Sequence, residues 1–253
     1  MGTDYNTIAE QYKRSKLTPW RAYIEQYTFL DILGDLSGRS VLDLACGEGF
    51  YTRLFKTRGA SRVLGVDLSG KMIDLARASE AEEPLGVDYA VGDAVTFRAG
   101  EAFDVVTAAY LLNYADTENR LADMCRAIAA ALKPGGLFLT VNNNPAQSPD
   151  RFDATRKYGF IKNVSEELRP GTPITYTVFL DDGPFSFDNY YLSPEAHERA
   201  LEGAGLTGVE WIRPRLSPEW RGDSRYWDAF FEDPSVVFLR ARMQRDPRLQ
   251  GYS

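Results

Sequence analysis

Short apolar runs alternate with helical patterns through the middle of the chain, and this alternation restricts the possible folds more than any other feature. Helical spacing of apolar residues predicts helices at 51–57, 71–80 and 121–132. β-type runs that predict strands lie between and around them, at 40–44, 62–66, 87–91, 103–109 and 137–141. Strands that alternate with helices form βαβ units, whose right-handed crossovers cover both faces of a parallel sheet. The pattern therefore predicts an α/β fold with a doubly wound, Rossmann-like sheet.

The pattern changes after the fifth predicted strand. Two β-like runs at 174–180 and 185–191 flank Asp181-Asp182-Gly183-Pro184, a strong turn sequence, so an antiparallel hairpin is expected there. A helix at 194–204 and strands at 209–212 and 236–239 are expected to complete a seven-stranded sheet. Within a single domain we thus predict an N-terminal helical arm (1–37), an α/β core (38–141), a lid or substrate insertion after strand five (142–192), and a closing helix, strands and tail (193–253).

Charge and composition exclude several classes of protein. The 253 residues include 29 basic and 36 acidic side chains, a net charge of −7, and no basic run, which disfavours nucleic acid as a partner. There is no apolar run of membrane-spanning length and no start of signal-peptide type, so we expect a cytoplasmic protein away from membranes. One histidine and two cysteines exclude a multi-histidine metal site and a disulfide framework, and no metal is expected. Both a monomer and a homodimer remain open.

The most informative stretch is the glycine loop that follows the first predicted strand. Gly47 and Gly49 let the backbone approach a ligand more closely than a Cβ would allow. Asp67, at the end of the second predicted strand, is placed to accept both hydroxyls of a ribose. Without Asp67, the two glycines would indicate only a tight turn. Thr52 stands near the position where a dinucleotide enzyme needs a third glycine for its pyrophosphate, so a cofactor without pyrophosphate is favoured.

Asp43 helps to distinguish a cationic cofactor from one that contains a pyrophosphate. An acid so close to the glycine loop is favourable beside a cation and repels a pyrophosphate. S-adenosylmethionine (SAM) has a sulfonium, an ammonium and a ribose, and it has no phosphate. Its chemistry fits Asp43 and Asp67 together.

At this point the chain resembles the class I SAM-dependent methyltransferases. The resemblance rests on the segments VLDLACGEG, GVDLS, VGDA, FDVVTAAYLLNY and LKPGG, in that order, and covers residues 38–141 and part of the arm. Ala45 stands where the usual pattern has a glycine. The resemblance implies SAM as cofactor and S-adenosylhomocysteine (SAH) as product. Gly47 and Gly49 would pack on the methionyl part, and Asp67 would hold the ribose.

Other cofactor contacts follow from the same resemblance. It places Leu68 and Met72 around the adenine, Asp93 and Ala94 at its amino edge, and Ala109 and Tyr110 beside the methyl-donor site. Simpler interpretations stay open. Met72 also fits the core of a helix, Asp93 fits the cap of a turn, and Tyr110 fits a side chain that only covers the pocket.

The N-terminal arm carries Tyr5, Ile8 and Tyr12 on one helical face. This face indicates either a helix packed on the domain or, as in similar small-molecule methyltransferases, a cover over the cofactor. Trp20 is a candidate substrate contact. Arg21 either pairs with the carboxylate of SAM or is a solvated surface charge.

The insertion begins with three asparagines at the end of strand five, the edge where α/β sheets bind ligands. Their amides either orient a polar heterocycle or form an Asn-rich turn. Many aromatic residues of the insertion belong in the core of the hairpin, and some are free to stack on a flat substrate. The candidate substrate contacts are Tyr5, Trp20, Asn113, Tyr114, Asn143, Asn144, Tyr158 and Tyr176, and the candidates for positioning the reaction are Tyr12, Tyr110 and Asn142.

These features predict a small-molecule N- or O-methyltransferase. Methyl transfer is an in-line displacement that needs a positioned nucleophile and excluded water, and no clear general base stands out. The segments LACGEGFYTR, YLLNYA, VNNNP and YYLSPEAHERAL resemble the bacterial group with the toxoflavin-pathway N-methyltransferase, which implies a planar, azapteridine-like heterocycle of natural-product biosynthesis. The alternatives are an O-methyltransferase of another metabolite and a non-catalytic SAM-binding regulatory protein. An NAD oxidoreductase is the least favoured.

Overall fold

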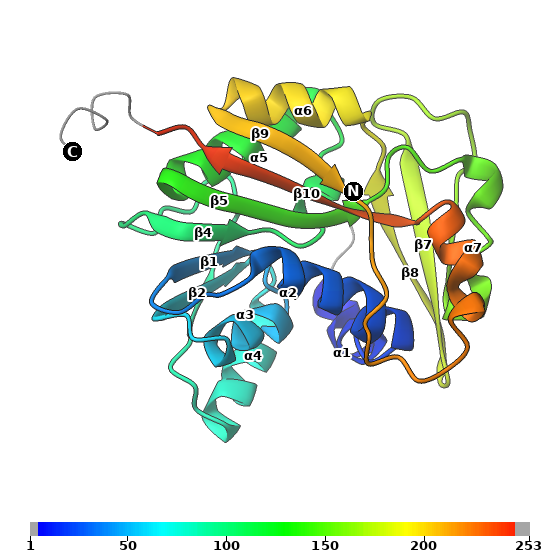
Figure 1. Ribbon diagram of the computed structural model, residues 1–253, viewed down its shortest axis with the longest axis horizontal. Helices are drawn as coiled ribbons and strands as arrows, with labels where there is room; N and C mark the ends of the chain where they lie inside the picture. Colours follow the sequence, from blue (N-terminus) through cyan, green and yellow to red (C-terminus); the bar gives the residue numbers. More distant parts are fainter. Residues whose placement is uncertain (1–4, 246–253) are drawn as a thin grey trace.

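A seven-stranded sheet forms the centre of the computed structural model, which describes residues 5–245 and the side chains of 9–245. The strand order is β3-β2-β1-β4-β5-β10-β9 (Figure 1). All neighbours pair in parallel except β10, which runs antiparallel to β5 and β9. The strands are β1 (Ser40–Leu44), β2 (Arg62–Asp67), β3 (Asp88–Val91), β4 (Phe103–Thr107), β5 (Leu132–Asn143), β9 (Leu206–Ile212) and β10 (Val236–Met243). The predicted α/β, seven-stranded, Rossmann-like sheet is confirmed.

Helices cover both faces of this sheet because its strands are apolar on both sides. Alternate residues of β1 show this, since Val41 packs with Phe29 and Phe55 on one face and Leu42 packs with Leu121 on the other. The first face carries α2 (Tyr27–Leu33), α3 (Phe50–Thr57) and α4 (Gly70–Glu82), and the second carries α5 (Glu118–Ala131) and α6 (Pro194–Gly203) (Figure 1).

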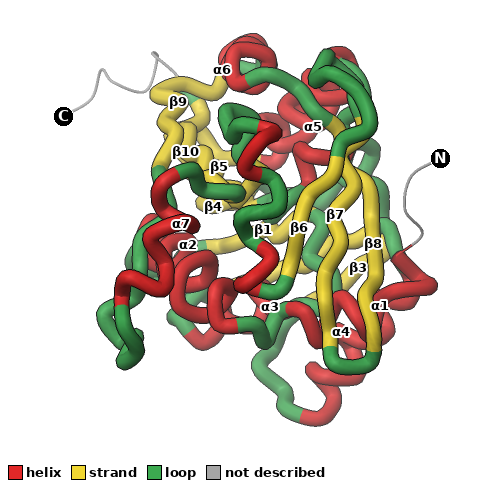
Figure 2. Tube along the Cα trace, turned by 90° about the vertical axis from the view of Figure 1, so that its right-hand side faces the viewer, coloured by secondary structure: helices red, strands yellow, loops and turns green. Residues whose placement is uncertain are grey.

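A second, smaller sheet lies beside the carboxyl ends of the central strands. It contains β6 (Phe160–Asn163), β7 (Pro173–Leu180) and β8 (Gly183–Tyr190), all antiparallel (Figure 2). The predicted hairpin is confirmed as β7 and β8. The third strand, β6, was not predicted, because its four residues are too few to show a period.

The N-terminal arm packs against both parts of the molecule. Helix α1 (Tyr5–Ser15) contacts α4 and β7, and an exposed ion pair joins Arg14 to Asp182 in the β7–β8 turn. A π-helical segment, Arg21–Gln26, follows and leads into α2. Helix α7 (Asp228–Glu232) packs near this segment through Trp20 and Phe230, whose ring centroids are 6.0 Å apart.

Several element ends differ from the prediction, and two of the differences have a clear physical cause. Strand β4 ends at Thr107 rather than at residue 109, because Tyr110 turns the chain with a φ of +63°. Strand β5 begins at Leu132 rather than at residue 137, and it takes in Pro134-Gly135-Gly136 with a register shift against β4. Within residues 5–245, no helix has the length and apolar character needed to cross a membrane.

Candidate active site

A cavity of about 300 Å³ opens at the carboxyl ends of β1, β2, β3 and β4. This is the edge where parallel α/β sheets bind ligands. We call it the cofactor cavity. Its walls are Tyr12, Ala45, Gly47, Asp67, Leu68, Met72, Gly92, Asp93, Ala94, Val95, Ala109, Tyr110, Leu111, Tyr114, Arg120, Met124 and Tyr190.

The two glycines of the loop have different tasks. Gly47 lines the cofactor cavity with a φ of +58°, and a Cβ placed on it would meet no atom within 4 Å. Gly49 does not line the cavity and caps the start of α3 with a φ of +85°. A Cβ on Gly49 would lie 2.4 Å from the hydroxyl of Tyr89. Packing therefore explains Gly49, and the left-handed backbone at an open cavity wall explains Gly47.

Asp67 lies on the cavity wall with both oxygens anchored. Its Oδ2 accepts a hydrogen bond from the backbone N–H of Gly47 at 2.8 Å, and its Oδ1 accepts from the N–H of Ser69 at 2.8 Å. Burial raises the pKa of Asp67, and these two hydrogen bonds oppose that rise. A carboxylate has about four lone-pair sites, so the fixed oxygens can still accept hydrogen bonds from a ligand.

Asp43 lies beneath the loop instead of on the cavity wall. The side chain is 1% exposed, and its oxygens accept hydrogen bonds from the hydroxyls of Thr52 at 2.7 Å and Thr107 at 2.8 Å. Burial raises the pKa of Asp43 to about 6, against the effect of these hydrogen bonds. The structure thus places Asp43 as a brace between β1, β4 and α3.

The far end of the cofactor cavity is apolar with one acidic corner. Met72 is buried, whereas Leu68 is 70% exposed at the rim. Asp93 accepts a hydrogen bond from the N–H of Val95 at 2.7 Å and forms an ion pair with Arg120 at 3.3 Å. Asp93 therefore caps a turn and also lines the cavity, and its contact with an adenine stays a prediction.

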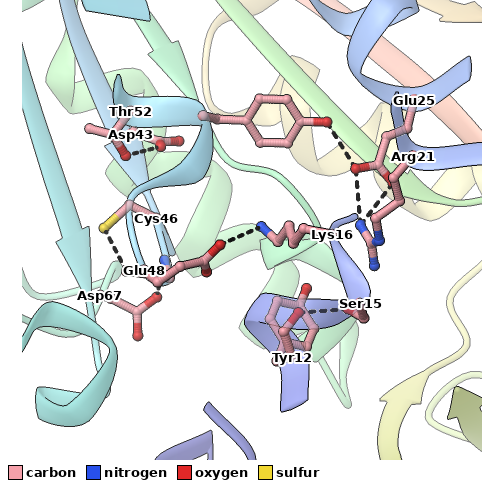
Figure 3. A network of polar contacts seen from close by, with 12 residues as sticks. Tyr12, Ser15, Lys16, Arg21, Glu25, Asp43, Cys46, Glu48, Thr52 and Asp67 are labelled. Carbon is pink, nitrogen blue, oxygen red and sulfur yellow. Dashed lines mark hydrogen bonds and ion pairs between the residues drawn. The ribbon is translucent and has the colours of Figure 1, made fainter. Parts of the chain in front are cut away.

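Arg21 and Glu25 form the centre of a buried polar network in the arm (Figure 3). The guanidinium donates to both carboxylate oxygens of Glu25 at 2.9 Å, and the hydroxyls of Tyr51 and Tyr110 donate to the same carboxylate. Burial alone would lower the pKa of Arg21, but Glu25 and the nearby tyrosines raise it. Arg21 is thus a buried, neutralised charge rather than a solvated one, and it does not line the cofactor cavity.

Lys16 is the cation of the arm that approaches the glycine loop (Figure 3). Its Nζ is 3.9 Å from Oε1 of Glu48, and both side chains are buried. Glu48 Oε2 has no hydrogen-bond partner among the described residues. Neither Lys16, Glu48 nor Glu25 was identified from the sequence. The spacing of Arg21 and Glu25, four residues apart on a helix, was an available signal for that pair.

A second, smaller cavity of about 30 Å³ lies next to the first. We call it the acceptor cavity, after the methyl acceptor that the sequence predicts beside the cofactor. Tyr12, Tyr110 and Tyr114 line both cavities and so form the boundary between them. The other wall residues are Trp20, Arg21, Asn143, Phe160, Tyr176, Val178, Phe187, Asn189 and Val236. Predicted substrate contacts from four separate segments, Trp20, Tyr114, Asn143 and Tyr176, therefore meet here.

Several other predicted contacts lie outside both cavities. Asn142 accepts a hydrogen bond from the Thr140 hydroxyl at 3.1 Å, because successive residues of β5 face opposite sides. Asn144 stabilises a turn by donating to the carbonyl of Pro234 at 2.8 Å, and Tyr158 donates to the carbonyl of Tyr226 at 2.8 Å. Asn113 is buried and lines neither cavity. The side chain of Tyr5 lies outside the described residues.

Comparison with known proteins agrees with this geometry. Residues 41–136 match the family described as Methyltransferase domain. N-demethylindolmycin N-methyltransferase from Streptomyces griseus is 32% identical over 171 residues, which cover 67% of this chain and 70% of that protein. The chain belongs to the SAM-dependent methyltransferases. It is an enzyme whose cavities and relatives fit a small-molecule substrate.

Another relative of this methyltransferase is an O-methyltransferase. Ubiquinone biosynthesis O-methyltransferase from Bordetella avium is 37% identical over 191 residues, 72% of this chain and 69% of the relative. Among solved structures, the CcbJ methyltransferase from Streptomyces caelestis has a TM-score of 0.65 at 19% identity, covering 96% of this chain and 97% of that chain. SAM-bound CalS10 from Micromonospora echinaspora, an amino pentose methyltransferase, has a TM-score of 0.60 at 21% identity, covering 96% and 100%. The two structures share the fold.

Proposed function

We propose that this methyltransferase binds SAM in the cofactor cavity and transfers its methyl group to a nitrogen of a small, flat, uncharged heterocycle. The heterocycle would lie along the three boundary tyrosines with its reacting edge in the acceptor cavity, because about 30 Å³ holds only part of a ring. The cavity walls fit SAM in three respects. Gly47 presents an open backbone face, Asp67 presents anchored carboxylate oxygens for a ribose, and Met72 with Leu68 presents an apolar surface for an adenine. When bound, SAM supplies an electrophilic methyl group on a sulfonium sulfur.

Residues of the arm close the two cavities against water and place polar side chains beside them. Tyr12 and Tyr110 stand between the cavities, and Glu25 fixes the hydroxyl of Tyr110. Lys16 and Glu48, held loosely at 3.9 Å, offer a cation and an anion beside the glycine loop. This pair is complementary to a zwitterionic amino-acid group, so we propose that it faces the methionyl end.

The composition of the acceptor cavity is the observation that carries the proposed substrate class. Of its described wall residues, seven are aromatic and two are asparagines. The one cation, Arg21, is neutralised by Glu25, so a charged acceptor would meet no uncompensated partner there. Flat rings with a few hydrogen-bonding groups suit such walls.

The same wall favours nitrogen over oxygen as the acceptor atom. Among the described residues of the acceptor cavity there is no aspartate, glutamate, histidine or lysine. Phenolic oxygens react well only after losing a proton, which calls for a general base. A neutral nitrogen with a free lone pair needs no base before it attacks. We propose, more narrowly, an azapteridine-like ring of natural-product biosynthesis.

The proposal is tested with purified enzyme, radiolabelled SAM and matched acceptors. The panel pairs 8-aminoquinoline with 8-hydroxyquinoline and adds N-demethylindolmycin and a pyrimidotriazine, and mass spectrometry locates each new methyl group. We expect label on nitrogen in at least one ring compound. Label restricted to oxygen would overturn the choice of atom, and SAM binding without transfer to any panel member would overturn the flat-heterocycle class.

A further inference from the structure

Asn143 and Asn189 join the two sheets inside the acceptor cavity. Asn143 ends β5 of the central sheet, and Asn189 lies near the end of β8 in the small sheet. The Nδ2 of Asn143 donates to Oδ1 of Asn189 at 2.9 Å, and both residues line the cavity. Asn189 was not identified as a site residue from the sequence, because nothing local connects it to Asn143.

The directions of both amides are fixed by this contact. The Nδ2 of Asn189 donates to the backbone carbonyl of Asp188 at 3.1 Å. Turning the Asn189 amide over would bring its oxygen against that carbonyl, and turning the Asn143 amide over would bring two amide oxygens together. Hydrogen-bond networks of this kind are what decide the orientation of an amide. These two hydrogen bonds therefore leave Asn143 Oδ1 as the unused acceptor of the Asn143–Asn189 pair. Among residues 9–245, no hydrogen bond involves that oxygen.

We infer that Asn189 is a positioning residue, which holds the Asn143 amide so that Oδ1 accepts the N–H hydrogen of the methyl-accepting nitrogen. This inference rests on the proposed function and adds a requirement, namely an amino group on the ring as the acceptor, because an amino nitrogen carries both an N–H and a free lone pair, whereas a ring N–H has its lone pair in the π system. An amino nitrogen held by its hydrogen has its lone pair fixed in direction, which is the main demand of an in-line displacement.

The chemistry of the step balances without a further reactant. The lone pair of the acceptor nitrogen forms the new N–C bond while the S–C bond breaks, and the sulfur keeps the bonding pair. The nitrogen then carries a positive charge, and its proton leaves to water after product release. Asn143 takes no proton in this scheme, since an amide oxygen is only a hydrogen-bond acceptor at neutral pH.

A purely mechanical role predicts something different. If the Asn143–Asn189 contact merely tied the small sheet to the central one, its loss would weaken every ligand of the acceptor cavity alike. Two probes separate these roles: indole and 1-methylindole share one flat ring system, and only indole has an N–H. Both are measured as binding probes against the enzyme saturated with SAH, by calorimetry or ligand-observed NMR.

We expect the wild-type enzyme to bind indole about 10-fold more tightly than 1-methylindole, the size of one well-made buried hydrogen bond. Asn143→Leu should abolish that preference, and Asn189→Leu should reduce it at least about threefold, with unchanged affinity for SAH. Asn163→Leu is the matched control, because Asn163 is an exposed asparagine of the same small sheet. It should keep the full preference.

The outcomes separate the inference from the proposed function. Equal binding of the two probes by the wild type, or an unchanged preference in Asn189→Leu, overturns the inference and leaves the flat acceptor standing. Failure of both probes to bind overturns the flat acceptor and the inference with it. Should Asn189→Leu lose SAH binding through misfolding, Asn189→Ala removes the same amide with less bulk and is judged by the same preference.

Discussion

The two cavities of this methyltransferase share a wall of three tyrosines and are built in opposite ways. The cofactor cavity is formed largely by the short segments that follow four neighbouring strands, and its key contacts involve backbone N–H groups. The acceptor cavity is formed by side chains from the arm, the turn after β4, the end of β5, the small sheet and the start of β10. One cavity is specified by local sequence and the other by long-range packing.

This difference predicts how each cavity responds to amino-acid substitution. Backbone-built walls tolerate replacement of most side chains, because the fold of the strands and turns fixes the hydrogen bonds. Side-chain walls change shape with each substitution. We therefore expect the acceptor specificity to be altered much more readily than cofactor binding.

The largest expected effect is at the residue that ties the arm to both cavities. Glu25→Gln keeps the shape of Glu25 but removes the charge that neutralises buried Arg21. Breaking one partner of a buried ion pair costs about 3 kcal/mol or more in the free energy of unfolding. Chemical denaturation measures this loss, with exposed Glu10→Gln as the control of equal chemistry. A variant as stable as the control would show that Arg21 does not depend on Glu25.

The next largest effect tests whether the cofactor cavity binds SAM independently of the acceptor cavity. Asp67→Ala should weaken SAM binding about 100-fold, because two ribose hydrogen bonds and the anchor of the Gly47 N–H are lost together. Calorimetry with SAM gives the Kd, and exposed Asp35→Ala serves as the control. Asn143→Leu should leave this Kd unchanged. A large loss of SAM affinity in Asn143→Leu would contradict the separation of the two cavities.

The comparison also explains what the sequence could predict. The sheet, the glycine loop and Asp67 follow from periodicity and from motifs a few residues long, and the structure places Gly47 and Asp67 on the wall of one cavity. Gly49 and Asp43 belong to the same motif, yet they support the loop from beneath, a distinction that only packing against Tyr89 and Thr107 reveals.

The acceptor side was much harder to predict, since its residues are distant in sequence. The choice between Asn142 and Asn143 depends on which face of β5 meets the small sheet, and a shift by one residue reverses it. The short strand β6 and the partner residue Asn189 leave no local signal. Composition identified an aromatic region, and the fold was needed to say which rings line a cavity.

Lys162 allows a pH test of the acceptor side. Its Nζ lies over the rings of Phe152 and Tyr176, at 4.6 and 5.7 Å, and among the described residues it donates only to the Ser235 carbonyl, at 3.4 Å. Burial lowers the pKa of Lys162 from 10.5 to about 7, and Asp233 opposes this shift. The lowered pKa alone corresponds to roughly 4 kcal/mol at pH 7, and loss of the contacts with the two rings and the Ser235 carbonyl offsets part of it. Lys162→Met should therefore raise the free energy of unfolding by roughly 2 kcal/mol at pH 7.

The sign of the pH dependence follows from the lowered pKa. Between pH 7 and 10.5 the unfolded chain holds a proton on Lys162 that the folded chain has lost, so wild-type stability rises with pH in this window. The advantage of Lys162→Met is therefore largest at pH 7 and below and shrinks toward pH 10. Exposed Lys13→Met should show no such trend. A pH-independent difference would mean that the folded protein keeps Lys162 charged.

The smallest effect concerns the one departure from the glycine pattern of the loop. Ala45 has a φ of +56°, a left-handed conformation that is unfavourable for alanine and easy for glycine. Ala45→Gly relieves that strain but adds freedom to the unfolded chain, so the net gain in the free energy of unfolding should be only roughly 0.5 kcal/mol. Ala78→Gly, on the exposed side of α4, should lose up to about 1 kcal/mol instead.

SAM affinity should stay the same in Ala45→Gly, because the backbone path that builds the cofactor cavity is kept. A weaker affinity would mean that the Ala45 methyl group, and not the backbone alone, shapes this wall.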